Sequence, residues 1–410
     1  MSLITYEEAI KIISESGSSQ RLGVETIPLN EITDRICAEE VTARMANQPF
    51  DNSAMDGFAL RASDLANATN DNPVVLEVGG HLSAGGGMPH ASLLRGQCFE
   101  IMTGAPLPPE CDTVVPVELT QKEDNGSVKF TSSVAIGDHV RRRGEDFIVG
   151  DKVVDAGDSL TPGHILALAT LGVSRVAIIK KPKVALLSTG LEIIDDLDAG
   201  LLPGKIYNST GPYLNAMMSK MGMERILNAS VADDVSVYKS KLLEAMQNEC
   251  DIILSTGAVS AGVHDFVPEV LKELGAKILF HKIAIRPGKP ILFAKFPNGG
   301  PFFFGLPGNP VSTAVGLRFL VQPLLREMQG LPPEEPIFAV LSDDYIKKKK
   351  ELRFFLRGQI NNQPDGRNTI YILPKQQSFM VSPFLTSNAW VMIPENVSKE
   401  SAGSPVTVYQ

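Results

Sequence analysis

The sequence lacks the cysteine and histidine patterns that build metal sites or disulfide frameworks. The four cysteines, Cys37, Cys98, Cys111 and Cys250, are scattered along the chain, and no two of them form a Cys-x-x-Cys pair. No histidine stands at zinc-ligand spacing from another histidine or from a cysteine. We therefore expect ordinary thiols, with neither a structural zinc site nor a disulfide framework.

Long apolar runs and a surplus of positive charge are also missing. Apolar runs such as Val184-Ala185-Leu186-Leu187 are far shorter than the roughly 20 residues of a membrane-spanning helix. Residues 1–8 show neither the basic region nor the apolar core of a secretion signal. The formal net charge of -9 argues against nucleic-acid binding. We therefore expect a cytoplasmic protein without membrane or nucleic-acid partners, in which anionic ligands need a local basic patch.

The composition that remains is typical of a large globular protein. Hydrophobic residues make up 43% of the 410 positions and charged residues 21%. This length exceeds what one hydrophobic core supports, so several domains are expected. The changes of pattern along the chain predict a discontinuous helical N-terminal domain, an inserted β-rich domain, an α/β domain and a small C-terminal β-domain. Their predicted boundaries are, in that order, 1–47 with 141–177, 48–140, 178–330 and 331–410.

The apolar residues of the N-terminal domain have helical spacing, whereas those of the insertion alternate with polar ones as in strands. Apolar residues at helical spacing predict a helix over residues 6–13, and a second short helix is predicted over 31–38. Thr161 followed by Pro162 is typical of a helix start. In the insertion, short alternating runs predict strands, and Asn125-Gly126 predicts a hairpin turn.

Strands and helices alternate between residues 183 and 329. Predicted strands cover residues 183–189, 224–231, 251–257, 276–285 and 302–305. Predicted helices cover residues 213–221, 235–247, 265–274 and 311–329. This spacing predicts a parallel α/β sheet, whose ligands would bind at the carboxyl ends of the strands. The C-terminal domain instead shows short strands, with a basic run at 347–350 that is expected to be a solvated turn.

Two predicted strands end in turns that combine hydroxyl groups with glycine. These turns, Ser188-Thr189-Gly190 and Ser255-Thr256-Gly257, offer hydroxyls and free backbone N–H groups, which suit phosphate or another oxyanion. Leu306-Pro307-Gly308-Asn309-Pro310 precedes the last helix of the domain. This run can form a stiff helix start, a rigid wall of the site, or both at once.

A cationic loop lies between the last strands of the α/β domain. It contains Arg286-Pro287-Gly288-Lys289-Pro290 and is preceded by Lys282. Two prolines around a glycine hold the backbone rigid while it approaches a ligand. The simpler alternative is a turn with exposed cations.

Five carboxylates are predicted on loops or at the ends of elements. They are Asp56, Asp146, Glu192, Asp233 and Asp265. Oxygen ligands of this kind suit Mg²⁺, which one or two carboxylates hold together with substrate phosphates. For each acid the alternative is a helix cap or a surface charge, and Asp233 beside Asp234 fits a cap best.

Further polar, glycine-rich runs accompany these features in a fixed order. They are Pro49-Phe50-Asp51-Asn52-Ser53-Ala54-Met55-Asp56-Gly57-Phe58-Ala59, Met102-Thr103-Gly104-Ala105-Pro106 and Arg141-Arg142-Arg143-Gly144-Glu145-Asp146. With the runs of the α/β domain, they resemble the molybdopterin molybdenumtransferase family, which includes MoeA and the E domain of gephyrin. The resemblance covers nearly the whole chain, and the ordered set is more specific than any one run.

The resemblance implies a fold and a reaction. It implies an elongated homodimer whose α/β domain is similar to small molybdopterin-binding proteins. The implied enzyme takes adenylylated molybdopterin and molybdate, cleaves the pyrophosphate bond, and yields molybdenum cofactor and AMP. Mg²⁺ is the implied cofactor, and other proteins of molybdenum cofactor biosynthesis are candidate partners.

The resemblance also implies roles for individual residues. The implied catalytic residues are Asp56, Thr103, Asp146, Glu192, Asp233 and Asp265, of which Asp146, Glu192 and Asp265 would hold the metal. The implied ligand-binding residues are Ser188, Thr189, Gly190, Ser255, Thr256, Gly257, Lys282, Arg286, Lys289, Pro307 and Pro310. The chain departs from the family at Leu191, where an aspartate is frequent, at Thr256 in place of a glycine, and at Arg286 in place of a lysine. Arg286 keeps the charge but presents forked donors.

Two other classes of function stay open on the sequence. One is an adenylyltransferase or pyrophosphatase built on the same α/β domain, and the insertion that carries residues 51–57 argues against it. The other is a non-catalytic molybdopterin-binding scaffold. The chain keeps the acidic and basic residues that the resemblance assigns to the reaction, which argues against a pure scaffold.

Overall fold

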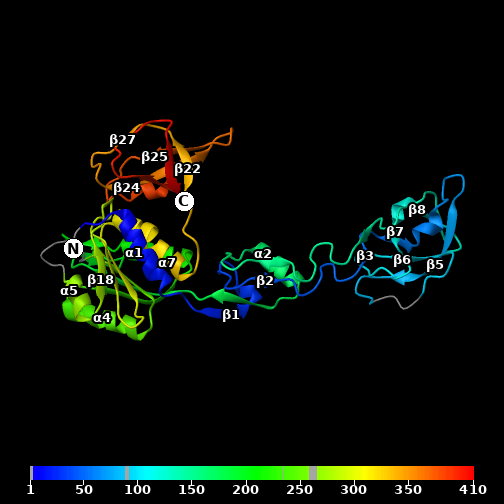
Figure 1. Cartoon of the computed structure of the whole chain (residues 1–410), viewed down its shortest axis with the longest axis horizontal. Helices are drawn as coiled ribbons and strands as arrows, with labels where there is room; N and C mark the ends of the chain where they lie inside the picture. The colour runs from blue at the N-terminus through cyan, green and yellow to red at the C-terminus, as the bar shows by residue number, and fades with distance from the viewer. Residues whose placement is uncertain (1–2, 88–91, 233, 258–265) are drawn as a thin grey trace. The chain divides into compact units, whose positions relative to one another are not determined.

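The computed structural model describes residues 3–87, 92–232, 234–257 and 266–410, and it divides into two compact units. The first unit comprises Met1–Glu25 and Ile179–Gln410, and the second comprises Thr26–Ile178 (Figure 1). This division is coarser than the four predicted domains, whose boundaries stay predictions. Each unit is described by itself.

The first unit is built on a six-stranded sheet with the order β16-β13-β17-β21-β20-β18. The strands are β13 (Lys183–Thr189), β16 (Glu224–Val231), β17 (Ile252–Thr256), β18 (Lys277–His281), β20 (Leu292–Lys295) and β21 (Phe302–Leu306). The first four strands of this order are parallel, as predicted. The last two pairings are antiparallel, because β20, a strand that the sequence analysis missed, runs opposite to both of its neighbours, β21 and β18.

Helices cover both faces of this sheet because the strand side chains alternate between two cores (Figure 1). In β13, Val184 and Leu186 belong to one core, and Ala185 and Leu187 belong to the other. The first core also receives α1, α3, α6 and α7, and the second receives α4 and α5. The helices are α1 (Tyr6–Ser18), α3 (Thr210–Lys220), α4 (Val235–Gln247), α5 (Val267–Glu273), α6 (Pro310–Gly316) and α7 (Gln322–Met328), with the π-helical turn η4 (Leu317–Val321) joining the last two.

The predicted strand over residues 276–285 is two strands in two different sheets. β18 ends at His281, and Lys282 has a left-handed backbone with φ of 79°. The chain then enters β19 (Ile285–Arg286), which pairs with β24 (Arg353–Asn362) of the C-terminal sheet. The left-handed residue therefore redirects the chain and sets the position of the cationic loop that follows.

The C-terminal part of the first unit is a β-barrel to which β19 adds one outer strand. Its order is β19-β24-β25-β22-β28-β26, and an additional pairing of β24 with β26 closes the ring. The other strands of the first unit are β14 (Ile193–Ile194), β15 (Ile206–Tyr207), β22 (Ile337–Leu341), β23 (Tyr345–Ile346), β25 (Asn368–Ile372), β26 (Ala389–Ile393), β27 (Lys399–Glu400) and β28 (Pro405–Tyr409). The solvated turn expected at residues 347–350 is wrong for Lys347, which is buried and donates from Nζ to the carbonyl oxygens of Leu352 and Pro394.

The second unit contains a six-stranded sheet with the order β7-β4-β6-β5-β9-β8, which confirms the predicted β-rich insertion. Its strands are β4 (Gly57–Leu60), β5 (Val74–Leu82), β6 (Gln97–Ile101), β7 (Thr113–Pro116), β8 (Thr120–Lys122) and β9 (Val128–Phe130). The hairpin predicted at Asn125-Gly126 joins β8 to β9, and Gly126 has the positive φ of 84° that such a turn requires.

The rest of the second unit has one α-helix, α2 (Pro162–Thr170), which begins at Thr161 as predicted. Short paired strands surround it: β1 (Val24–Pro28) with β12 (Arg175–Ile179), β2 (Val41–Thr42) with β11 (Lys152–Val154), and β3 (Asn52–Ser53) with β10 (Val140–Arg141). The predicted helix over residues 31–38 is wrong. Ile32 and Cys37 are buried in a core with Val154, Val176 and Ile178. The chain turns between them at Asp34, whose φ is 60°, and Cys37 bridges to Ile178.

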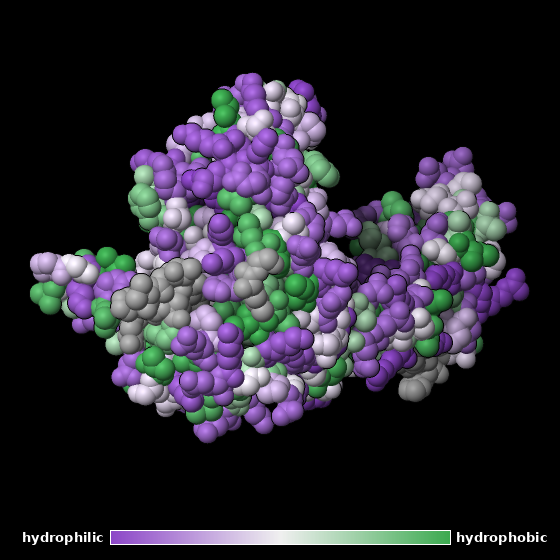
Figure 2. All heavy atoms as spheres, turned by 60° about the vertical axis from the view of Figure 1, so that its left-hand side comes forward, coloured by the Kyte–Doolittle hydropathy of each residue, from purple (hydrophilic) through white to green (hydrophobic). Residues whose placement is uncertain are grey.

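All four cysteines are buried and unpaired, as predicted. Burial raises the pKa of the Cys98, Cys111 and Cys250 thiols to about 12. Among the described residues, no helix is long and apolar enough to cross a membrane. Figure 2 shows a face on which hydrophilic side chains predominate and hydrophobic ones gather in smaller groups.

The central position of β13 leads to a first prediction. Leu186→Ala should lower the free energy of unfolding of the first unit by about 2–5 kcal/mol, because it removes a fully buried side chain between two helices and the sheet. The measurement is urea-induced unfolding followed by circular dichroism. The matched control is Leu202→Ala at an exposed position, which should change the free energy by less than about 0.5 kcal/mol. Equal losses in both variants would contradict the described core.

Candidate functional site

The predicted turns of the α/β domain come together at one edge of the sheet. β13, β17 and β21 are neighbouring parallel strands, with Ser188 opposite Thr256 and Thr256 opposite Leu306. The turns that follow them therefore start at the same level along the sheet. In open α/β sheets this carboxyl edge is where ligands bind.

Gly257 is the point at which these turns meet most closely. Its backbone N–H donates to the Leu306 carbonyl oxygen at 3.1 Å, and its φ is 86°. A Cβ at this position would lie 2.4 Å from the carbonyl oxygen and 2.6 Å from Oγ1 of Thr189, and a Cβ on Gly308 would lie 3.9 Å from the Gly257 Cα. Only glycine fits between the end of β13 and the turn after β21.

The hydroxyl groups at the strand ends make internal hydrogen bonds. Thr189 donates from Oγ1 to the Thr256 carbonyl oxygen at 3.0 Å, and Ser255 Oγ lies 2.8 Å from the hydroxyl of the fully buried Tyr238. The Thr256 hydroxyl is buried and has no hydrogen-bond partner in the described part of the chain. The Thr189 and Ser255 hydroxyls are therefore engaged within the site itself. The predicted ligand contacts of these residues stay predictions.

Asn208 joins three segments of the site, and the sequence reasoning missed it. Its Nδ2 donates to Asp195 Oδ1 at 2.8 Å and to Ser188 Oγ at 3.3 Å, and its Oδ1 accepts from the Gly211 N–H at 2.8 Å. The side chain is buried, and it fixes the start of α3 against the end of β13. A usable signal was present, because Asn208-Ser209-Thr210 precedes a helical run and asparagine, serine and threonine favour helix starts.

Glu192 is an exposed carboxylate beside the end of β13. A Cβ on Gly190 would lie 2.9 Å from Glu192 Oε2, so the carboxylate folds back over this glycine. Lys205 donates from Nζ to the Leu191 carbonyl oxygen at 2.5 Å and holds the turn. Within the described residues Glu192 forms no ion pair, which leaves its oxygens available to a bound cation.

The cationic loop packs beside the same edge. A Cβ on Gly288 would lie 3.2 Å from the Ile285 and Ile291 side chains and 3.7 Å from the Ser312 carbonyl oxygen in the first turns of α6. Backbone bonds from Lys282 to Ile291 and from Ile283 to Lys289 close the loop. The loop therefore lies against the helix that begins directly after Pro307 and Pro310.

The three cations of this loop have no carboxylate partners among the residues that the structure describes. Arg286 and Lys289 are exposed, and Lys282 is half-buried. The Arg286 guanidinium lies 5.4 Å from the centre of the Phe354 ring, which limits its orientation. Three positive charges without counter-ions give this edge the local basic character that anionic ligands require on an acidic chain.

Pro307 and Pro310 lie in the turn between β21 and α6, and their role as a wall of the site stays a prediction. The Pro307 carbonyl oxygen accepts from Thr313 Oγ1 at 2.6 Å, and Pro310 is the first residue of α6. The backbone N–H of Val311 donates to the Ser378 carbonyl oxygen at 3.0 Å, so a loop of the C-terminal barrel also reaches this helix start.

In the second unit, Asp56 and Thr103 lie together as one hydrogen-bonded pair. Thr103 donates from its backbone N–H at 2.7 Å and from its hydroxyl at 2.8 Å to Asp56 Oδ1. These bonds, the backbone one first, lower the pKa of the exposed Asp56 carboxyl. Asp56 therefore stays ionised well into the acidic range, with its second oxygen free.

Of the remaining predicted acids, the structure describes Asp146 but not Asp233 or Asp265. Asp146 is exposed in the second unit, and its Oδ2 accepts from Asn47 Nδ2 at 2.8 Å. Asp233 and Asp265 lie outside the described residues, and Asp234 caps α4 by accepting from the Ser236 and Val237 N–H groups. No group of three acidic, histidine or cysteine side chains in the described ranges is arranged to hold a metal ion. The predicted set of Asp146, Glu192 and Asp265 stays a prediction.

Family models match the chain along most of its length. They are the MoeA N-terminal region (domain I and II) over residues 4–172, a probable molybdopterin binding domain over 185–327, and the MoeA C-terminal region (domain IV) over 339–410. The boundary between the last two falls where the α/β sheet gives way to the C-terminal barrel.

Curated relatives and a solved structure agree with these models. A molybdopterin molybdenumtransferase of Synechococcus elongatus is 35% identical over 99% of both chains, and one of Bacillus subtilis is 33% identical over 99% of this chain and 93% of its own length. The crystal structure of a molybdopterin biosynthesis MoeA protein from a Pyrococcus species is similar with a TM-score of 0.82, at 30% identity, over 99% of this chain and 98% of that one. The chain belongs to the molybdopterin molybdenumtransferase (MoeA) family.

Proposed function

We propose that this chain is a molybdopterin molybdenumtransferase. It takes adenylylated molybdopterin and molybdate, and it releases AMP as the molybdenum cofactor forms. One observation carries the proposal most strongly, namely the meeting of three strand-end turns at Gly257 beside a loop with three unpaired cations. Both substrates are anionic, and this edge is the basic, backbone-lined place that such ligands need.

The residues of this edge have separate roles in binding. The backbone N–H groups of the turn after β13 face phosphate oxygens, and Lys282, Arg286 and Lys289 neutralise the charges of the pterin phosphate, the nucleotide phosphate and molybdate. Pro307 and Pro310 hold the wall of the site rigid, so little backbone motion is frozen on binding. Asn208 keeps the start of α3 and the end of β13 in register.

Mg²⁺ is the cation that we propose for the acidic part of the site. The exposed Glu192 carboxylate has no counter-ion among the described residues, and Asp146 accepts one hydrogen bond from the Asn47 amide, so both have oxygen lone pairs available to a cation. With Asp265, they would hold an ion that keeps several waters and bridges to phosphate. When bound, the ion supplies charge neutralisation at the phosphate that leaves.

We further propose a cytoplasmic homodimer in which each site draws on two chains. The ground is the family resemblance, in which Asp56 and Thr103 of the β-rich insertion serve the site of the partner. The hydrogen-bonded Asp56–Thr103 pair is a preformed acidic unit with one free oxygen, as a contribution in trans would require.

The direct test is turnover with adenylylated molybdopterin and molybdate. The proposal expects AMP release together with cofactor that activates a molybdenum-free apoenzyme. Release of AMP without active cofactor would instead identify a pyrophosphatase. Tight binding without release of AMP would identify a scaffold.

The cationic loop leads to a prediction about affinity. Lys289→Ala should raise the Kd for molybdopterin about tenfold or more, because a charge-assisted hydrogen bond contributes about 1.5–3 kcal/mol. Its fold should persist, since Lys289 is exposed and contributes little to a core. Isothermal titration measures the change, and Lys181→Ala, another exposed lysine, is the matched control. An unchanged Kd for Lys289→Ala would remove this loop from the site.

The acidic residues lead to a prediction about turnover. Glu192→Gln keeps the shape of the side chain and removes one charge, so folding should persist and substrate binding should be kept or tightened. Turnover should fall at least about a hundredfold, because the ion that stabilises the leaving phosphate is lost. Single-turnover kinetics with quantified AMP make the measurement. AMP release at the parent rate under saturating substrate would refute the metal role of Glu192.

The proposed sharing of the site leads to a prediction about mixed dimers. Asp56→Ala and Glu192→Ala proteins should each be inactive, and their mixture should recover activity after subunit exchange, because one of the two hybrid sites keeps both residues. Recovery of about a quarter of the parent activity is expected, since half of the dimers are hybrids and each has one intact site. Mixing differently tagged parent chains controls for exchange. No recovery after proven exchange would place both residues in the site of a single chain.

A further inference from the structure

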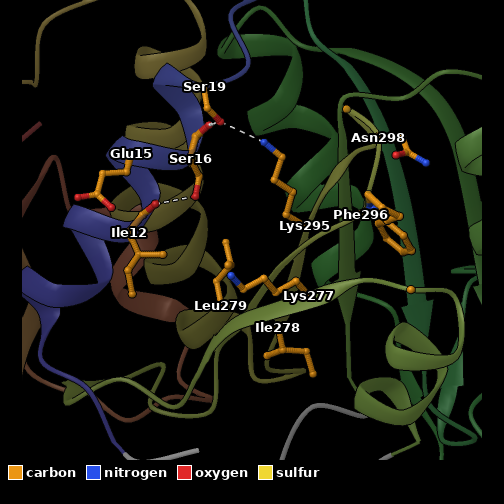
Figure 3. A pocket seen from close by; sticks show the side chains of 13 residues that line it. Ile12, Glu15, Ser16, Ser19, Lys277, Ile278, Leu279, Lys295, Phe296 and Asn298 are labelled. Carbon is orange, nitrogen blue, oxygen red and sulfur yellow. Dashed lines mark hydrogen bonds between the residues drawn. The ribbon is translucent and has the colours of Figure 1, made fainter.

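A groove lies between α1 and the pair of strands β18 and β20, at the end of the sheet opposite the candidate site. It has a volume of about 800 Å³, and its walls include Ile12, Ser16, Ser19, Lys277, Leu279 and Lys295 (Figure 3). Lys295 is opposite Phe302, the first residue of β21, so the groove is at the amino end of a strand whose carboxyl end borders the candidate site. Small-molecule sites have volumes of about 300–1,000 Å³. We refer to this feature as the lysine groove.

Two lysines of the groove are direct neighbours across the sheet. In the antiparallel pair of β18 and β20, Lys277 is the partner of Lys295, and the side chains of such partners lie on the same face. Phe293 stands two residues before Lys295 and packs into the core that α1 shares. Because side chains alternate along a strand, both lysines lie on the α1 side of the sheet. Like charges directly opposite each other destabilise a strand pair.

Lys295 is held in one place and is partly removed from water. Its Nζ donates to Ser19 Oγ at 3.0 Å and lies 4.8 Å from the centre of the buried Phe302 ring. The Ser19 hydroxyl donates its own proton to the Ser16 carbonyl oxygen at 2.6 Å, so its oxygen is fixed as an acceptor for the lysine. The Lys295 side chain is half-buried. An ammonium group that is already positioned loses little freedom when an anion binds to it.

Lys277 supplies a second positive charge that no carboxylate neutralises. It is exposed, and its side chain has no hydrogen-bond or ion-pair partner among the residues that the structure describes. Of the described lining residues, only Glu15 carries a carboxylate, and in Figure 3 this carboxylate turns away from both lysines. The flexible stem of Lys277 allows its ammonium group to reach a ligand that contacts Lys295.

A doubly charged anion suits these two lysines better than a single carboxylate does. A phosphate monoester carries a charge of about −1.5 to −2 at neutral pH and has three terminal oxygens, so one group can accept from both ammonium groups. A carboxylate would leave one of the two positive charges unneutralised. Ile12 and Leu279 provide apolar surface in the same groove, on which the rest of a small molecule can lie.

We propose that the lysine groove binds a small phosphate monoester. The phosphate group lies between the ammonium groups of Lys277 and Lys295, and the remainder of the molecule lies on the side chains of Ile12 and Leu279. Binding removes the repulsion between the two lysines, so the ligand also stabilises the first unit. This site is separate from the transferase site proposed above and does not depend on it.

Protection of lysines from acetylation tests the proposal on the full-length protein. The probe is phenyl phosphate at a pH above its second pKa of about 6, with the ionic strength held constant by sodium chloride. Mass spectrometry measures the rate at which a water-soluble reagent acetylates each lysine. Lys277 and Lys295 should be half-protected below about 10 mM probe, and the exposed Lys181 should stay unprotected. No protection of Lys277 up to that concentration, or equal protection of Lys181, would overturn the proposal.

A matched ligand tests the requirement for a double charge. Phenyl sulfate has nearly the shape of phenyl phosphate but carries a single negative charge. It should protect Lys277 at least about fivefold more weakly, because it neutralises one ammonium group instead of two. Equal protection by the two ligands would overturn the assignment of a phosphate site.

Protein variants locate the interaction. Lys277→Gln should raise the phenyl phosphate concentration that protects Lys295 at least about fivefold, because one of the two charges is lost. Lys289→Gln, in the cationic loop of the candidate site, should change the protection of Lys277 and Lys295 by less than about twofold. Transferase turnover is the folding control and should be unchanged in Lys277→Gln. Unchanged protection of Lys295 in Lys277→Gln would contradict a shared ligand.

Thermal unfolding separates a binding site from two lysines that merely share a surface. Without ligand, Lys277→Gln should have a Tm at least as high as that of the parent, because a like-charge pair is removed. Saturating phenyl phosphate should raise the Tm of the parent and of Lys181→Gln by equal amounts, and that of Lys277→Gln by less. A lower Tm for unliganded Lys277→Gln, or an equal rise in all three proteins, would overturn the proposal.

Discussion

The contact around Gly257 is the constraint on which the candidate site depends. The backbone of this residue lies between the end of β13 and the turn after β21, in a space that excludes even a methyl group. Its hydrogen bond to Leu306 joins the ends of β17 and β21, and the bond from Thr189 Oγ1 to the Thr256 carbonyl oxygen joins the ends of β13 and β17. Separating these turns would move every backbone N–H group that an anion could contact. This edge lies within residues 185–327, which match a probable molybdopterin binding domain.

The C-terminal barrel fixes the charge of that edge. β19, which contains Arg286, pairs with β24 of the barrel, and the Arg286 guanidinium lies against Phe354 of the same strand. The buried Arg357 donates to the carbonyl oxygens of Lys375 and Met380, and so holds the loop whose Ser378 bonds to the start of α6. The barrel thus acts on the site without supplying the phosphate-facing turns. It orients a short cationic segment that would otherwise be a free hairpin, and this lowers the entropy cost of binding an anion.

Local patterns in the sequence predicted the parts of the site that depend on local chemistry. Buried-type strands followed by glycine indicated the turn at Gly257, and paired prolines indicated the wall at Pro307. Features set by distant contacts were missed or wrong. The reversed strand β20 was missed, because its place between β21 and β18 depends on pairing, which apolar runs do not encode. Residues 31–38 have a helix-compatible composition, but Ile32 and Cys37 pack into a core with other segments and the chain turns between them at Asp34. Asn208 was overlooked although its helix-start signal was visible, because a buried bridge to Ser188 involves residues far apart in the sequence.

The central claim is that the anionic substrate binds at the carboxyl ends of β13, β17 and β21. A crystal structure of the chain with AMP, the nucleotide product of the proposed reaction, tests it most directly. The account predicts phosphate density within hydrogen-bond distance of the backbone near Gly190 or Gly257, with Lys289 or Arg286 turned toward it. Nucleotide bound only at another place on the chain, with the turn at Gly257 left unchanged and unliganded at saturating AMP, would contradict it.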